Sequence, residues 1–195
     1  MFPEIERILI DRDRIAARVG EVGRALAADL TRDLAAEGNA PADGGRVVMV
    51  PILTGSVVFL ADLIREMPVK LSLGVVAVSS YPGKSVASKG AALRSELPKD
   101  LAGKHVVVVD DILDSGRTFA LVKSLIEEQG PASVRTCTFL RKPADVRAVE
   151  IDADYSCFEI PDEFVVGYGL DYDGYYRNLP EVAVLDASTL EDAEG

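Results

Sequence analysis

The stretch Val106-Val107-Val108-Val109-Asp110-Asp111-Ile112-Leu113-Asp114-Ser115-Gly116-Arg117-Thr118 is the most informative part of this sequence. Its run of valines, opened by His105, predicts a buried strand that ends at two adjacent acids. A short turn then leads into a helix that we expect to run from about Gly116 to Gln129. A strand, a turn and a helix in this order are typical of an open parallel sheet, where ligands bind at the carboxyl ends of the strands.

Strands and helices alternate through the rest of the chain. The strands are apolar throughout rather than at every second residue, which indicates a mostly parallel sheet covered by helices on both faces. The sequence therefore predicts an α/β fold in a single domain over residues 1–195. Expected strands cover residues 47–53, 71–78, 134–140, 156–160 and 164–168, and expected helices cover residues 10–34 and 57–65.

The acids and the turn after the valine run suit a phosphorylated sugar. Asp110 and Asp111 can bind sugar hydroxyls, directly or through Mg²⁺ and its waters. Gly116 lets a phosphate approach the free amides at a helix start, and Ser115 and Thr118 add hydroxyl donors. The alternative is that Asp114 and Ser115 merely cap the helix. No Gly-x-x-x-x-Gly-Lys-Ser/Thr motif occurs in the chain, which argues against nucleoside triphosphate hydrolysis.

A second block, residues 158–179, combines an aromatic residue, an apolar strand and an acid-rich turn. Phe164 beside backbone amides suits a flat heterocycle, because the ring stacks on the aromatic face while backbone groups contact its edge. An ordinary core strand followed by a solvated turn is the alternative, and composition alone does not separate the two.

Bulk properties exclude several classes. The net charge of −11 argues against nucleic acid as the main partner, although a local pocket can still bind a small phosphorylated ligand. No apolar run reaches the ~20 residues of a membrane helix, and the start lacks the layout of a secretory signal, so we expect a cytoplasmic enzyme without a membrane partner. Cys137 and Cys157 are expected to be buried thiols, and His105, the only histidine, to be structural.

The first block resembles the phosphoribosyl pyrophosphate signature of the type I phosphoribosyltransferases. The second closely resembles the carboxyl-terminal purine-binding segment of the hypoxanthine-guanine phosphoribosyltransferases within that family. Looser matches at Leu53-Thr54-Gly55-Ser56 and Ser79-Ser80-Tyr81 extend the resemblance over most of residues 47–185. It implies the type I phosphoribosyltransferase fold, with a small hood formed by the terminal segments and a mobile active-site loop over about residues 81–99 that opens at Ser80 and Tyr81. A disordered surface insertion is the alternative for this polar segment.

The resemblance also implies a role for individual residues. Asp114 would be the catalytic base, and Phe164 would stack on the purine while the Val165 backbone contacts its edge. Lys142 would bind the 6-oxo group. Phosphoribosyl pyrophosphate would be bound by Asp110, Asp111, Asp114, Ser115, Gly116, Arg117, Thr118, Thr54, Gly55 and Arg177, the base by Lys142, Phe164, Val165 and Asp171, and Mg²⁺ by Asp110, Asp111 and Asp171. Many members carry a basic residue where this chain has Thr54.

The activity that the resemblance implies is purine salvage, in which a 6-oxopurine accepts the phosphoribosyl group and pyrophosphate is released. Hypoxanthine, guanine and xanthine are the candidate bases, and a homodimer or homotetramer is the expected assembly. Two alternatives stay open at this point. One is a regulatory protein of the same fold that senses phosphoribosyl pyrophosphate, and the other is a transferase for another base.

Overall fold

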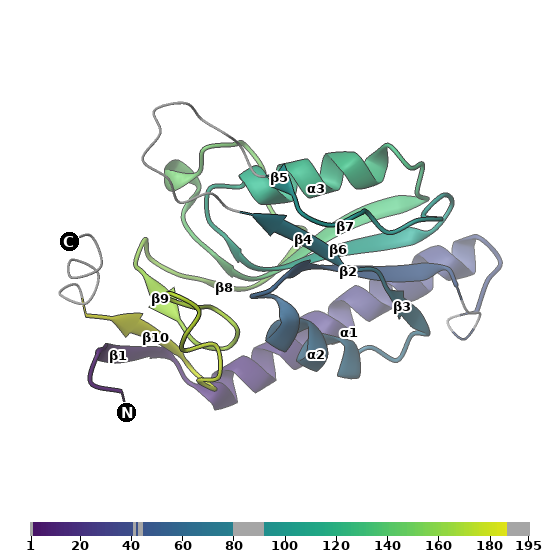
Figure 1. Ribbon diagram of the computed structural model, residues 1–195. Helices are drawn as coiled ribbons and strands as arrows, with labels where there is room; N and C mark the ends of the chain where they lie inside the picture. The colour runs from purple at the N-terminus through teal and green to yellow at the C-terminus, as the bar shows by residue number, and fades with distance from the viewer. Residues whose placement is uncertain (1, 41, 43–44, 80–91, 187–195) are drawn as a thin grey trace.

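The computed structural model describes residues 2–40, 42, 45–79 and 92–186 (Figure 1). Its main sheet has seven strands in the order β5-β4-β2-β6-β7-β8, with β3 also pairing with β2. All neighbours are parallel except β4 and β5, so the predicted open, mostly parallel sheet is confirmed. The strands are β2 (Val47–Leu53), β3 (Leu71–Leu73), β4 (Val76–Ser79), β5 (Ala92–Leu93), β6 (His105–Leu113), β7 (Ser133–Arg141) and β8 (Tyr155–Glu159).

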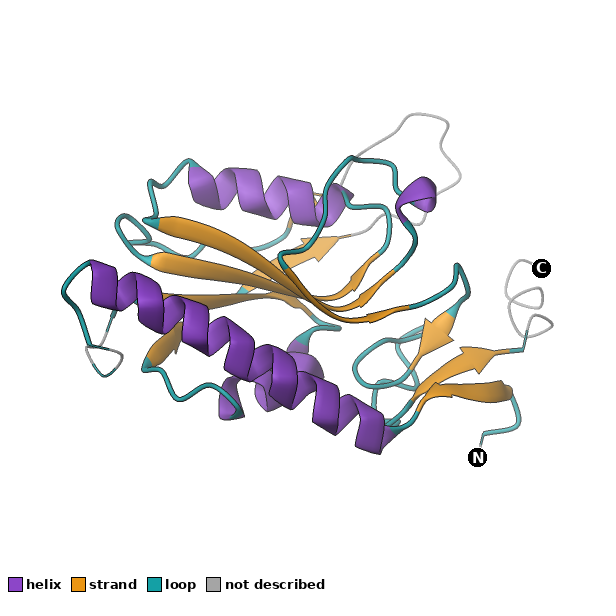
Figure 2. Cartoon of the chain, turned by 180° about the vertical axis from the view of Figure 1, so that it is seen from behind, coloured by secondary structure: helices purple, strands orange, loops and turns teal. Residues whose placement is uncertain are grey.

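Helices cover both faces of this sheet, as Figures 1 and 2 show from opposite sides. Helices α1 (Arg12–Ala36) and α2 (Val57–Arg65) pack on one face, and α3 (Arg117–Glu127) packs on the other. Alternate residues of β2 supply the two cores, with Met49 facing α1 and α2 while Val50 lies in the same cluster as Ile126 of α3. Burial on both faces explains why these strands are apolar at every position.

Both ends of the chain build a second, smaller sheet. Strands β1 (Ile5–Ile10), β10 (Val182–Leu185) and β9 (Val165–Val166) pair antiparallel in the order β1-β10-β9. This small sheet is the hood that the family resemblance implied, and it lies beside the amino end of α1 (Figure 1). An ion pair between Arg7 and Glu163 joins β1 to the segment before β9.

Several predicted boundaries were wrong, each for a local reason. The first helix begins at Arg12, because Ile10 ends β1 and the side chain of Asp11 caps the helix by accepting from the amides of Asp13 and Arg14. The expected strand 71–78 is two strands, β3 and β4, separated by Gly74 and Val75.

Two further boundaries moved at the edge of the sheet that carries the acids. Strand β6 extends to Leu113, which pairs with Arg141, so the acids lie within the strand and not after it. The expected strand 164–168 is limited to β9, because Gly167 and Tyr168 have positive φ angles of 96° and 48°.

The predicted loop of residues 81–99, with its opening residues Ser80 and Tyr81, lies mostly outside the described residues. Its described part, from residue 92 onward, contains β5, which pairs antiparallel with β4. Among the helices that the structure describes, none is long and apolar enough to cross a membrane.

Candidate active site

A cavity of about 320 Å³ opens at the carboxyl ends of β2 and β6, where the sequence predicted a ligand site. It is lined by the turn after β2, by the acids of β6 and by the loop that leads into α3. Ten of the predicted site residues line it: Thr54, Gly55, Asp110, Asp111, Asp114, Ser115, Gly116, Thr118, Asp171 and Arg177. Arg117 does not line it, and its side chain is exposed at the first position of α3.

The loop before α3 is suited to an anion. Gly116 precedes the helix with a φ angle of 79°, a left-handed conformation that favours glycine. Among the described residues, no side chain caps this helix end, so its first amides are available to a ligand. With Ser115 and Thr118 beside them, these amides can hold a phosphate group.

Asp110 and Asp111 form a strained electrostatic pair on β6. Burial and the neighbouring charge of Asp111 raise the pKa of Asp110 well above its usual range, and burial also raises the pKa of Asp111. The amide of Asp111 donates to Oδ1 of Asp110 at 3.0 Å, and the amide of Ile112 donates to Oδ1 of Asp111 at 2.8 Å. Hydroxyl donors or a cation in this cavity would stabilise the ionised pair.

Three backbone segments meet beside Asp111. A Cβ atom at Gly55 would lie 1.5 Å from Oδ2 of Asp111, and one at Gly169 would lie 2.1 Å from the carbonyl oxygen of Gly55. Only glycine therefore allows the turn after β2 to approach both the acid and the 167–170 turn. The peptide bond between Leu53 and Thr54 in this turn is cis.

Arg177 and Asp171 also line this cavity and form a hydrogen-bonded unit. Nη2 of Arg177 lies 2.6 Å from Oδ1 of Asp171, and Nη1 donates to the carbonyl oxygen of Gly169 at 2.6 Å. The other oxygen of Asp171 accepts the amide of Gly174 at 2.8 Å. These bonds hold one positive and one negative group in fixed positions at the cavity.

A second cavity, of about 220 Å³, adjoins the first. Its lining includes Lys142, Phe164 and Val165, all predicted base-binding residues, together with Glu163 and Leu170. Phe164 is 43% exposed and makes a T-shaped contact with Tyr172, with ring centroids 5.5 Å apart. A partly exposed aromatic ring beside the apolar residues Val165 and Leu170 suits a flat ring.

Lys142 reaches into this second cavity from the end of β7. Its Nζ lies 2.7 Å from Oδ1 of Asp162 and 3.5 Å from Oδ1 of Asp114. Partial burial lowers the pKa of Lys142, but the hydrogen bond to Asp162 and the charges of both acids outweigh this and raise it. The amine is therefore a charged donor in the wall of the base-sized cavity.

The two cavities share Asp111, Ile112, Asp114 and Asp171 in their linings. A sugar phosphate in the first and a flat ring in the second would consequently meet beside Asp114. The junction is the place where a bond between sugar and ring could form or break, with a carboxylate next to the reacting atoms.

Some residues at or beside the two cavities were not singled out in the sequence. Ile112 lies between the acids and lines both cavities, yet an apolar residue in a strand carries no functional signal. Asp162 and Glu163 belong to the segment that resembles the purine site, but their contacts to Lys142 and Arg7 need the folded chain. His105 lies at the opposite end of β6, where its Nδ1 is 2.8 Å from the hydroxyl of Ser133, and Cys137 and Cys157 are buried free thiols.

Comparison with known proteins agrees with this geometry. The sequence profile of the phosphoribosyl transferase domain matches residues 19–173. The hypoxanthine-guanine phosphoribosyltransferase of Streptococcus pneumoniae is 40% identical over 182 residues, which cover 93% of this chain and 94% of the relative. The Mycobacterium avium enzyme of the same name is 40% identical over 188 residues, covering 95% of this chain and 89% of the relative.

Solved structures give the same result. The hypoxanthine phosphoribosyltransferase of Trypanosoma cruzi, complexed with its product IMP, superposes with a TM-score of 0.87 at 30% identity, over 100% of this chain and 98% of that one. The hypoxanthine phosphoribosyltransferase of Staphylococcus aureus superposes with a TM-score of 0.83 at 33% identity, over 95% of this chain and 94% of that one. The predicted resemblance is confirmed, and the chain belongs to the phosphoribosyltransferase family, among the hypoxanthine-guanine phosphoribosyltransferases.

Proposed function

We propose that this chain transfers the phosphoribosyl group of phosphoribosyl pyrophosphate to a 6-oxopurine, forming a nucleoside monophosphate and pyrophosphate. The observation that carries the proposal is the pair of adjoining cavities. One has a phosphate loop and two acids, the other has an exposed aromatic ring and a charged lysine, and Asp114 lies where they join.

The sugar phosphate would occupy the larger cavity. Its 5′-phosphate would bind the amides at the start of α3 with Ser115 and Thr118, and its ribose hydroxyls would bind Asp110 and Asp111. The pyrophosphate group would lie between the turn of Thr54 and Gly55 and the guanidinium of Arg177. Thr54 offers no positive charge there, so its contribution would come from its backbone and hydroxyl.

The base would occupy the smaller cavity. Its ring would stack on Phe164, its 6-oxo group would accept from Nζ of Lys142, and the backbone of Val165 would contact its edge. Hypoxanthine, guanine and xanthine share the 6-oxo group and differ at the ring 2-position. The preference among them would be decided by the backbone carbonyls near Val165 and Asp171.

Mg²⁺ fits the residues of this site. Two acids with raised pKa values lie side by side, and Asp171 lines the same cavity, so an ion bound there with the pyrophosphate would stabilise the ionised pair. The described residues contain no group of three or more acids, histidines or cysteines that could hold a metal alone. That pattern suits Mg²⁺, which is commonly held by one or two carboxylates together with substrate phosphates and water. Bound in this way, the ion would neutralise charge on the leaving group.

The chain's own residues would carry out the transfer. A ring nitrogen forms the new bond to the anomeric carbon while the bond from that carbon to the pyrophosphate oxygen breaks, and the electron pair leaves with pyrophosphate. Arg177 stabilises the charge that develops on the leaving oxygens. The proton of the ring nitrogen passes to the carboxylate of Asp114, which also favours the partly cationic ribose.

The decisive experiment is an incubation of the purified protein with phosphoribosyl pyrophosphate, Mg²⁺ and one base at a time. We expect nucleotide from one or more of hypoxanthine, guanine and xanthine, and none from adenine. Omitting Mg²⁺ should abolish product formation. Protein that binds phosphoribosyl pyrophosphate yet forms no nucleotide with any base would support the regulatory alternative, for which the relatives named above give no support.

Assembly and location complete the proposal. We expect a homodimer or homotetramer in the cytoplasm, acting on small molecules without nucleic acid or membrane as a partner. Light scattering of the purified protein would give its mass in solution, and a monomer at working concentration would contradict the expected assembly.

A further inference from the structure

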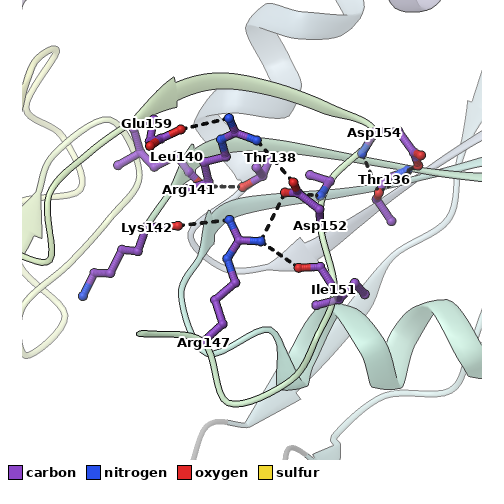
Figure 3. Close-up of polar contacts among 11 residues, drawn as sticks. Thr136, Thr138, Leu140, Arg141, Lys142, Arg147, Ile151, Asp152, Asp154 and Glu159 are labelled. Atoms are coloured by element: carbon purple, nitrogen blue, oxygen red, sulfur yellow. Dashed lines mark hydrogen bonds and ion pairs between the residues drawn. The ribbon is translucent and has the colours of Figure 1, made fainter. Parts of the chain in front are cut away.

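A single segment, residues 142–152, contacts both cavities, because Lys142 lines the smaller one and backbone hydrogen bonds connect the segment to Leu113 and Ser115, which line the larger one. It begins at Lys142 in the base cavity, forms a short 3₁₀ helix, Ala144–Val146, and returns across the phosphate loop. Figure 3 shows the polar contacts of this segment, with the side chain of Arg147 at their centre and the side chain of Lys142 extending away from them.

Arg147 ties the two ends of the segment together. Its Nη2 donates to the carbonyl oxygen of Lys142 at 3.1 Å. Its Nη1 donates to the carbonyl oxygen of Ile151 at 2.8 Å and lies 3.3 Å from Oδ1 of Asp152. The side chain is only 8% exposed, so these bonds are shielded from water. The planar guanidinium fixes both carbonyl groups in direction as well as in distance.

The segment is also bonded to the phosphate loop. The amide of Ala148 donates to the carbonyl oxygen of Ser115 at 3.0 Å, and the amide of Lys142 donates to that of Leu113 at 3.0 Å. Residues 149–151 pack closely on Gly116, where an added Cβ would lie 2.7 Å from Cγ2 of Ile151. The conformation of residues 142–152 therefore affects the phosphate loop and Lys142 together.

We propose that Arg147 is a positioning residue that keeps Lys142 and the Ser115–Gly116 turn in fixed positions relative to each other. It lines neither of the two substrate cavities, so it acts through these groups and not on a substrate. Without the guanidinium, the partly buried bond to the carbonyl of Lys142 is lost and the two ends of the segment are no longer tied together, so Lys142 and the Ser115–Gly116 turn both become less well positioned. This inference rests on the proposed function, because its effect is read in substrate binding.

The test compares Arg147→Met and Arg147→Lys with the unaltered protein. Methionine keeps the buried stem but removes all donors, whereas lysine keeps the charge and reaches one end of the segment only. We expect Arg147→Met to raise KM for the 6-oxopurine about 10-fold and KM for phosphoribosyl pyrophosphate several-fold. The two KM values of Arg147→Lys should lie between those of Arg147→Met and those of the unaltered enzyme.

Arg141→Gln is the matched control. Arg141 also pairs with Asp152, at 3.4 Å, and with Glu159, at 2.9 Å, but it bonds to no carbonyl group of the segment among the described contacts. Its ion pairs are exposed and contribute little, so both KM values should stay unchanged. A double-mutant cycle with Lys142→Met then tests whether Arg147 acts on base binding through Lys142. If it does, Arg147→Met should raise the KM for the base only slightly once the amine of Lys142 is gone.

The outcomes separate the inference from the function on which it rests. If the unaltered protein forms no nucleotide, the proposed function fails. If the unaltered protein is active but an Arg147 variant shows unaltered KM values and only a smaller amount of folded protein, Arg147 is a structural residue. The inference is then wrong. Fully additive effects of Arg147→Met and Lys142→Met on the base KM would also overturn it.

Discussion

Nζ of Lys142 lies 3.5 Å from Oδ1 of Asp114, so the proposed ligand of the base and the proposed acceptor of its proton are in direct electrostatic contact. Nζ of Lys142 is also 2.7 Å from Oδ1 of Asp162. A purine bound between Lys142 and Phe164 would therefore present its ring next to the Asp114 carboxylate. This placement links recognition of the 6-oxo group to proton removal, and it makes the contributions of the two residues separable by mutation.

Asp114→Asn should lower kcat by about 10²–10⁴-fold, the usual contribution of a positioned proton acceptor, while both KM values change little. Asparagine keeps the shape of the side chain and its place at the junction of the cavities but accepts no proton. Steady-state kinetics with hypoxanthine and with phosphoribosyl pyrophosphate would measure this. Unchanged turnover would remove Asp114 from the mechanism.

Lys142→Met should raise KM for the 6-oxopurine by about 10–100-fold, because a buried charged hydrogen bond to the 6-oxo group is lost. KM for phosphoribosyl pyrophosphate should change far less, since the amine does not line the larger cavity. Lys123→Met is the control, because Lys123 also pairs with an acid, Glu127, but lies on α3 away from the base. Equal effects on both substrate KM values would contradict a role specific to the base.

The parts of the fold that the sequence predicted well are those whose burial is two-sided. Strand β2 was predicted at its observed bounds, because a continuous apolar run bounded by turn residues has few other interpretations. Strands β1 and β10 were not predicted. They are four to six residues long and stabilise each other across nearly the whole chain, so no local pattern marks either one.

The residues of the site also fall into those that the sequence revealed and those that it did not. Asp110, Asp111 and Gly116 were found because acids and glycine at a strand–helix junction have few structural reasons to occur together. Arg147 was not found, since its task is to bond carbonyl groups at Lys142 and Ile151, and any surface arginine has the same appearance in a sequence. Residues that act on backbone atoms are visible only after folding.

Gly55→Ala should weaken phosphoribosyl pyrophosphate binding by at least about 10-fold, because the new Cβ would lie 1.5 Å from Oδ2 of Asp111 and must displace that carboxylate or the turn. Gly20→Ala is the matched control, since the nearest atoms to its Cβ would be the ends of the long side chains of Arg24, at 2.9 Å, and Glu66, at 3.2 Å. Alanine within α1 should leave binding unchanged and add up to about 1 kcal/mol of stability. Titration calorimetry and thermal unfolding would measure both variants, and equal binding by Gly55→Ala and the unaltered protein would contradict the close approach.

Asp110→Asn should stabilise the free protein at neutral pH and reduce the rise in Tm that phosphoribosyl pyrophosphate and Mg²⁺ produce. Burial and Asp111 raise the pKa of Asp110 well above its ordinary value of 3.8, so the folded state binds the proton more tightly than the unfolded chain. The stability that this proton contributes is complete below about pH 3.8 and is lost as the pH rises through the raised pKa. Asparagine stays neutral and can still accept the Asp111 amide, so the variant should gain a few degrees in Tm at pH 7, at about 2–4 °C per kcal/mol, and little near pH 3.5.

Adding Mg²⁺ with phosphoribosyl pyrophosphate should then raise the Tm of the unaltered protein by more than that of the variant, because only the ionised acid pair binds the ribose and the cation at full strength. A variant less stable than the unaltered protein at pH 7 would show that the ionised pair is already compensated in the free protein.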